Sequence, residues 1–133
     1  MIQIARAVYD EMIAHALETR PFECCGVLAG SGGIVTQGFR AENVADLNGV
    51  RYEVDPKAFL RINREIDDAD LELLGIYHSH PFTRAYPSAT DLAQAWEGLV
   101  YVIVSLTDFL APDVKAFTVV NGEITEQTVE VGA

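Results

Sequence analysis

Apolar residues near the start of the chain recur every three or four positions. The members of this set are Ala5, Val8, Met12, Ile13, Ala16 and Leu17. Their spacing places them on one face of a helix, so it predicts an amphipathic helix over residues 5–17 that ends before Pro21. His15 is assigned to the polar side of this helix, and we expect it to be a surface residue.

Short apolar runs bounded by glycine, proline or asparagine predict the strands. The strands expected on this basis cover residues 24–29, 34–39, 51–54, 73–80 and 99–106, with two more around Asn121-Gly122 within residues 114–131. Gly30 to Gly33 form the turn of a first hairpin, and Asn121-Gly122 tolerates the positive φ angles of a type I′ turn. The chain therefore closes with a second hairpin.

Two further helices begin at proline. Asp55 can cap the exposed amides of a helix that starts at Pro56, and an apolar stripe then extends this helix to about residue 69. Pro87-Ser88 opens a third helix that runs to about Glu97. Three helices and one mixed sheet predict an α+β, loosely α/β, class with a single domain over residues 1–133.

Composition and charge narrow the class of partner. Half of the 133 residues are hydrophobic and the net charge is −11, which is typical of a globular protein but repels nucleic acid and anionic membranes. No apolar run reaches the roughly 20 residues of a membrane span, and the charged residues Arg6, Asp10 and Glu11 replace the apolar core of a signal peptide. We expect a cytoplasmic protein that binds neither nucleic acid nor membrane.

The two cysteines are neighbours. A bond between Cys24 and Cys25 would close a strained ring, so both are expected to be reduced thiols. Cys25 should share a strand face with the preceding Glu23. A thiolate at Cys25 could then approach a metal, but we favour a small buried hydrophobe.

The segment His78-Ser79-His80-Pro81 carries the clearest chemical signal. Side chains two positions apart in a strand point to the same face, so His78 and His80 can bind one ion at about 2.0 to 2.1 Å. Asp91, in the first turn of the third helix, can supply a third ligand and leave the fourth tetrahedral position to water. These residues predict one catalytic zinc ion per chain. Hydrolysis at such a site also requires a general base.

These residues resemble the JAMM, or MPN-plus, metallopeptidase family. The family pattern is a Glu before a Cys-Gly strand, then His-x-His-Pro, seven residues, Ser, two residues and Asp. Glu23, His78, His80, Ser88 and Asp91 fill every position. The resemblance implies that Glu23 is the general acid and base, that Ser88 stabilises the oxyanion, and that the other three residues bind zinc. It also implies a curved mixed sheet flanked by helices, in a layout like that of cytidine deaminases.

Within the family, the chain is most similar to bacterial peptidases that process small ubiquitin-like sulfur-carrier proteins. The similarity lies in residues 75–80, the loop that ends at Ser88 and the opening helix. It implies hydrolysis after the carrier's terminal Gly-Gly and release of an amino acid such as cysteine. The large insertions that ubiquitin-chain-cleaving members use are not present in the sequence.

Simpler roles exist for the same residues. Ser88-x-x-Asp91 is also a capping box, and capping could itself orient a metal ligand. Arg84 and Tyr86 lie between His80 and Ser88 and could contact substrate, although exposed loop positions are the simpler interpretation.

Other functions fit the sequence less well. A general isopeptidase uses the same chemistry, whereas silent scaffolds of this fold lack ligands that this chain retains. The DNA-associated RadC-like relatives disagree with a charge of −11, and a zinc deaminase needs a Pro-Cys-x-x-Cys motif that does not occur. In a sequence, the apolar stripe of a subunit interface has the same pattern as that of a core. The sequence therefore allows a homodimer as well as a monomer.

Overall fold

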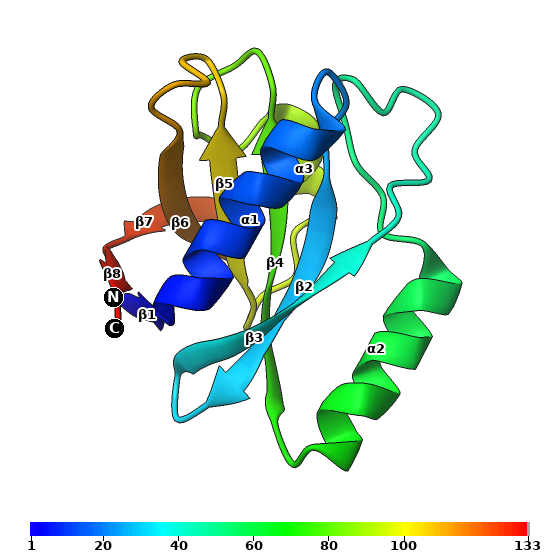
Figure 1. Ribbon diagram of the computed structural model, residues 1–133, viewed down its shortest axis with the longest axis vertical. Coiled ribbons are helices and arrows are strands. Elements are labelled where there is room, and N and C mark those ends of the chain that lie inside the picture. The colour runs from blue at the N-terminus through cyan, green and yellow to red at the C-terminus, as the bar shows by residue number, and fades with distance from the viewer. Residues whose placement is uncertain (133) are drawn as a thin grey trace.

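A mixed sheet of eight strands forms the centre of the protein in the computed structural model, which describes residues 1–132 (Figure 1). The elements in chain order are β1 (Ile2–Ile4), α1 (Arg6–Thr19), β2 (Cys25–Ser31), β3 (Ile34–Ala41), α2 (Pro56–Asp68), β4 (Glu72–His80), α3 (Ala89–Gln94), β5 (Val100–Ser105), β6 (Asp113–Val120), β7 (Glu123–Gln127) and β8 (Val129–Val131). The predicted α+β class and curved mixed sheet are confirmed.

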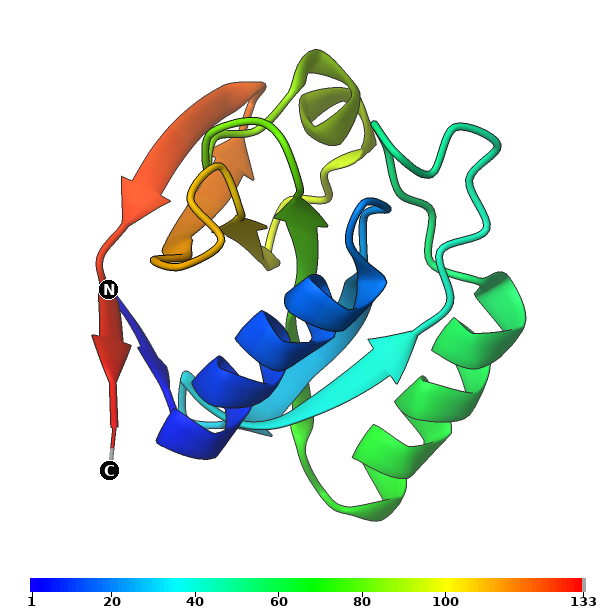
Figure 2. The ribbon, with the colours of Figure 1, turned by 45° about the horizontal axis from the view of Figure 1, so that its top comes forward.

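The sheet curls back on itself. Its strand order is β7-β6-β5-β4-β2-β3-β1-β8, with β4 parallel to β5 and β1 parallel to both β3 and β8. β7 and β8 lie at opposite ends of this order, yet only Thr128 separates them in the chain. The short link therefore bends the sheet around α1, as Figure 2 shows.

The two long helices cover opposite faces of the sheet. Val8, Met12 and Ala16 of α1 belong to one apolar cluster with Leu28 and Tyr77 of the sheet. Ile62 and Ile66 of α2 belong to a second cluster with Cys25, Val27 and Ile76. Alternating residues of β2 and β4 thus face different helices, as the pleat of a strand requires. His78 and His80 follow Ile76 at intervals of two and lie on the α2 face.

One predicted strand is wrong. Residues 51–54 form no ladder, and only Val54 makes an isolated bridge, to Asn43. The Asn43 side chain takes up the backbone groups that a neighbouring strand would pair. Its Nδ2 donates to the carbonyl oxygen of Arg51 at 3.1 Å, and its Oδ1 accepts from the Glu53 amide at 2.9 Å. Hydrogen bonds from the Asn43 side chain hold residues 51–54 as a loop, so that no strand forms there.

The third helix is shorter than predicted and ends at Gln94 instead of near Glu97. Ala95 is extended, the Trp96 amide donates to the Tyr101 hydroxyl at 2.7 Å, and Gly98 turns the chain at a φ of +91° into β5. β1 was not predicted, and the second strand of the predicted closing hairpin is divided at Thr128 into β7 and β8. No helix within residues 1–132 has the length and apolar character needed to cross a membrane.

The prediction of a surface His15 is wrong. His15 is only 8% exposed, and its Nδ1 lies 2.7 Å from the hydroxyl of the buried Tyr77. Burial, followed by the charge of Arg40, lowers the pKa of His15, so the neutral ring is favoured. His15 follows Met12 by three positions and therefore lies on the buried stripe of α1.

Candidate functional site

The end of β4 brings two imidazoles to one side of the sheet. His78 and His80 are 1% and 4% exposed, and their Nε2 atoms lie 3.1 Å apart. β2 runs antiparallel to β4 with Cys25 opposite His78. This register carries Glu23, which precedes β2, towards the same imidazoles. Glu23, His78 and His80 each offer an atom within 4.8 Å of the others, a grouping that could hold a metal ion.

Asp91 completes a compact triangle of ligand atoms. Its Oδ2 lies 3.1 Å from Nε2 of His78 and 3.0 Å from Nε2 of His80. Ligands at 2.0 to 2.1 Å from a tetrahedral ion are about 3.3 Å apart, so the three atoms approximate one face of such a site. The hydrogen bonds from His78 and His80 outweigh the effect of burial and hold the pKa of Asp91 below its usual range. The three predicted metal ligands are therefore brought together.

The remaining nitrogen of His80 supports this arrangement. Nδ1 lies 2.9 Å from the carbonyl oxygen of Arg84, which can only accept a hydrogen bond. Nδ1 therefore carries a proton. Burial lowers the pKa of His80, but the hydrogen bonds to Asp91 and to the Arg84 carbonyl raise it overall, so Nε2 offers its lone pair to a metal once its own proton is released. His78 is oriented differently, because the ring of Tyr52 stacks on it with centroids 4.2 Å apart. Burial lowers the pKa of His78 and favours the neutral form that metals require.

Ser88 caps the helix that carries Asp91. The Asp91 amide donates to Ser88 Oγ at 3.1 Å, and the Ser88 amide donates to Asp91 Oδ2 at 3.0 Å. Both halves of the predicted capping box are present. The cap fixes the position of Asp91 Oδ2, and the Ser88 hydroxyl proton stays free to donate to another group.

Glu23 is a buried carboxylate. It is 4% exposed, and its Oε1 has no hydrogen-bond partner within residues 1–132. The loop after β3 fixes its main chain, because Asn43 Nδ2 donates to the Glu23 carbonyl oxygen at 3.0 Å and the Glu23 amide donates to the Asn48 carbonyl oxygen at 2.7 Å. Burial raises the pKa of Glu23 to about 7, with smaller opposing effects of His80 and Asp91. Such a group can exchange protons near neutral pH.

A groove of about 640 Å³ lies between α2, β4 and the segment that precedes β5. Its lining is mostly apolar and includes Tyr52, Phe59, Ile76, Trp96, Leu99 and Tyr101. Tyr52 also stacks on His78, so this ring separates the groove from the ligand cluster. An extended peptide with small side chains suits such a groove.

The remaining candidates have different environments. Cys25 is fully buried in the α2-facing cluster, and burial raises the pKa of its thiol to about 12, so it is a small buried hydrophobe as predicted. Arg84 and Tyr86 are exposed in the loop after β4, with the Arg84 guanidinium 4.7 Å from the centre of the Tyr86 ring.

Sequence reasoning missed Asn43 and Tyr52. Asn43 lies in a polar segment without regular spacing, and Tyr52 lies in the segment 51–54 that was predicted as a strand.

Known proteins share this chain's sequence over most of its length. Residues 5–120 match Prok-JAB, the prokaryotic homologues of the JAB domain. The CysO-cysteine peptidase of Mycobacterium tuberculosis is 35% identical over 133 residues, which cover 98% of this chain and 91% of that protein. The desampylase of Haloferax volcanii is 40% identical over 111 residues, which cover 78% of this chain and 80% of that protein.

Solved structures share its fold. The solution structure of a protein from Desulfitobacterium hafniense superposes with a TM-score of 0.90 at 31% identity, over 99% of this chain and 93% of that chain. A JAB1/MPN domain protein from Archaeoglobus fulgidus has the same fold, with a TM-score of 0.66 at 18% identity over 100% and 98% of the two chains. The family match and the identity across almost the whole chain confirm the predicted resemblance: the protein belongs to the Prok-JAB family and is a hydrolase of the JAMM type.

Proposed function

We propose that the protein is a zinc-dependent peptidase that hydrolyses the bond after the terminal Gly-Gly of a small ubiquitin-like sulfur-carrier protein and releases an amino acid such as cysteine. One observation carries the proposal. The buried Glu23 presents an unpartnered carboxylate oxygen beside three ligand atoms that lie 3.0 to 3.1 Å from one another. This pairing of a general base with a metal-ligand triangle is what metal-assisted hydrolysis of an amide requires.

His78, His80 and Asp91 would hold one zinc ion per chain. The residues fit this role because two imidazoles and one carboxylate form a nearly equilateral set, and a JAMM site leaves a fourth position open. When bound, zinc would polarise the scissile carbonyl and lower the pKa of a water molecule towards 7. Tyr52 and the Arg84 carbonyl oxygen keep the two rings in position for it.

Glu23 moves the proton. In this proposal its carboxylate takes a proton from the attacking water and hands it to the nitrogen of the leaving amino acid. A pKa of about 7 suits both steps, because the group can accept and release a proton near neutral pH. Ser88, whose Oγ accepts from the Asp91 amide, can donate its hydroxyl proton to the developing oxyanion.

The shape of the surroundings favours a narrow substrate tail. The apolar groove next to His78 suits an extended glycine tail, which has no side chains to exclude. The two relatives are named as a CysO-cysteine peptidase and a desampylase, and both names point to small modifier proteins as substrates. This chain covers 91% and 80% of their lengths.

Metal content tests the ligand assignment. Protein purified without added metal should contain close to one zinc per chain by elemental analysis. The single variants His78→Ala, His80→Ala and Asp91→Ala should each lose the metal. Cys25→Ala is the matched control, because it removes another potential ligand from the same face but should keep zinc. Zinc retained in all three ligand variants would reject the assignment.

Substrate choice is tested by comparing two conjugates. A carrier with one cysteine after Gly-Gly should have a kcat/KM at least about tenfold above that of a two-ubiquitin conjugate, which corresponds to about 1.4 kcal/mol of discrimination. Equal or faster cleavage of the ubiquitin conjugate would identify a general isopeptidase and overturn the carrier assignment. The metallopeptidase chemistry would survive that result.

A further inference from the structure

The loop after β4 places Arg84, which has no carboxylate partner within residues 1–132, beside the metal-ligand cluster. The carbonyl oxygen of Arg84 is bound to His80 Nδ1 at 2.9 Å, so the backbone of Arg84 is fixed relative to a ligand. The arginine ion pairs within residues 1–132 use Arg6 and Arg40, which leaves the Arg84 charge without a carboxylate partner in the described chain. In a chain with a net charge of −11, this cation is available to a ligand.

A contact with Tyr86 fixes the orientation of the Arg84 guanidinium. It lies 4.7 Å from the centre of the Tyr86 ring, a cation–π contact. Tyr86 in turn packs edge to face on Phe117, with ring centroids 5.5 Å apart, and Phe117 is fully buried. The exposed arginine therefore rests on a ring that is anchored to the core. Less side-chain freedom is lost when such a group binds an anion.

The two ends of a substrate would meet different sides of the ligand cluster. Tyr52, which lines the apolar groove, stacks on His78. The Arg84 loop reaches the cluster through His80. Glu23, which in the proposed reaction protonates the leaving nitrogen, offers an atom within 4.8 Å of both histidines. With the tail on the Tyr52 and His78 side of the cluster, the leaving residue lies on the His80 and Arg84 side.

We infer that Arg84 is a specificity-determining residue that binds the free α-carboxylate of a single-residue leaving group. The inference rests on the proposed function, which it extends from the carrier tail to the released amino acid. Arginine presents two parallel N–H donors that match the two oxygens of a carboxylate. Without this arginine, the negative charge of the chain would repel the α-carboxylate of the leaving group. A lysine side chain as leaving group, within a folded protein, has no carboxylate at this place. Arg84 therefore selects a one-residue terminal extension over an isopeptide bond.

The test crosses two enzymes with two substrates. Zinc-loaded wild type and Arg84→Gln are each given a carrier that ends in Gly-Gly-Cys with either a free carboxylate or a carboxamide at the new end. Wild type should prefer the carboxylate by about 10- to 100-fold in kcat/KM, and Arg84→Gln should lose this preference while cleaving the carboxamide at the wild-type rate. Retained cleavage of the carboxamide shows that the variant is folded and catalytically intact.

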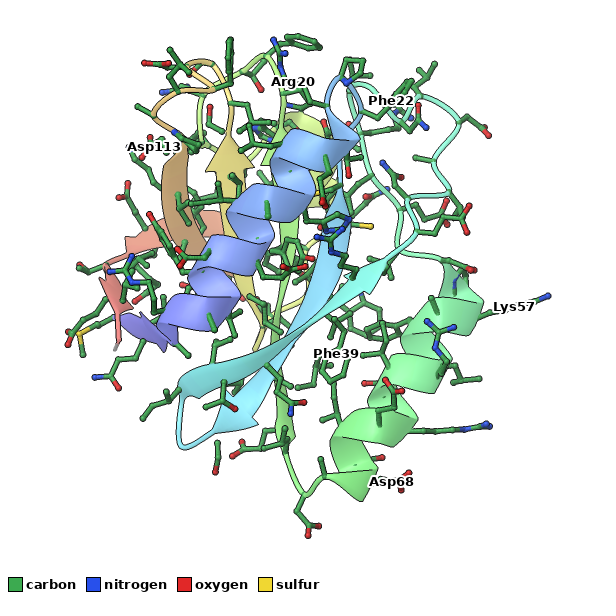
Figure 3. The ribbon with its side chains drawn as sticks, viewed as in Figure 1. Arg20, Phe22, Phe39, Lys57, Asp68 and Asp113 are labelled. Atoms are coloured by element: carbon green, nitrogen blue, oxygen red, sulfur yellow. The ribbon has the colours of Figure 1, made fainter. Side chains whose placement is uncertain are left out.

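Arg20 provides a matched control. It lies at the end of α1 (Figure 3), is exposed, and stacks on Phe109 at 4.9 Å and Phe82 at 5.9 Å, but no bond ties it to a ligand histidine. Arg20→Gln removes the same charge and should keep the preference. Equal cleavage of both substrates by wild type, or an unchanged preference in Arg84→Gln, overturns the role of Arg84 alone. Cleavage of neither substrate by wild type overturns the proposed function, and the inference with it.

Discussion

Replacement of Glu23 by glutamine should stabilise the metal-free protein at alkaline pH. The Glu23 carboxylate is 4% exposed, and its Oε1 has no partner within residues 1–132. Ionisation in that position costs free energy because water and hydrogen-bond donors are missing. Glutamine keeps the size of the side chain and removes the charge.

The size and sign of the effect follow from the pKa. Burial raises the pKa of Glu23 from 4.5 to about 7. Below pH 4.5 the carboxyl is protonated in both states and adds no difference. Between pH 4.5 and 7 the unfolded chain releases its proton first, so the free energy of unfolding of the wild type falls as pH rises. The full difference is about 3 kcal/mol. Reorientation of polar groups around the charged carboxylate lowers this difference to about 1 to 3 kcal/mol.

Urea unfolding at pH 5 and pH 8, with a chelator present, measures this effect. The stability of Glu23→Gln relative to wild type should increase between the two pH values by about 1 to 3 kcal/mol. Glu126→Gln, which replaces an exposed carboxylate, should show the same difference from wild type at both pH values. An increase for Glu126→Gln as large as that for Glu23→Gln, or no increase for Glu23→Gln, would refute the reasoning.

Three further substitutions test other parts of the site. Ser88→Ala should lower turnover by roughly 10² with little change in KM and should cost about 1 kcal/mol of stability, because the cap on Asp91 is lost; steady-state kinetics and urea unfolding report the two effects. A defect in KM alone would count against an oxyanion role. Tyr77→Phe leaves the buried His15 Nδ1 without its 2.7 Å partner and should cost about 1 to 3 kcal/mol in urea unfolding, with zinc content unchanged. Gly26→Ala should lower the thermal midpoint strongly, because the new Cβ would overlap the ring of Tyr77; a wild-type midpoint would show that the ring can move aside.

The ligand set could be predicted because its geometry is largely local. His78 and His80 share a strand face at a spacing of two, and Asp91 sits at a capped helix start that Pro87-Ser88 announces. These positions depend on short stretches of backbone. The placement of Glu23 beside them depends on the register between β2 and β4, which only the family pattern could supply.

The errors concern contacts with residues outside the segment that was being predicted. His15 was assigned by residue type, but the hydroxyl of Tyr77 satisfies its ring inside the protein. Residues 51–54 have strand-like composition, yet the Asn43 side chain bonds their backbone. β1 and β8 contain only 3 residues each, and their parallel pairing joins the two ends of the chain. Periodicity within one segment carries no information about such partners.

The central claim is that Glu23 and the three-ligand cluster remove one amino acid from a carrier's Gly-Gly end. The most direct measurement is the intact mass of a carrier-cysteine adduct over time, with zinc-loaded wild type and zinc-loaded Glu23→Gln. The account predicts that wild type shortens the adduct by one cysteine, and that Glu23→Gln does so roughly 10² to 10⁴ times more slowly at equal zinc content. An adduct left intact by the wild type, or cut equally fast by Glu23→Gln, would contradict the account.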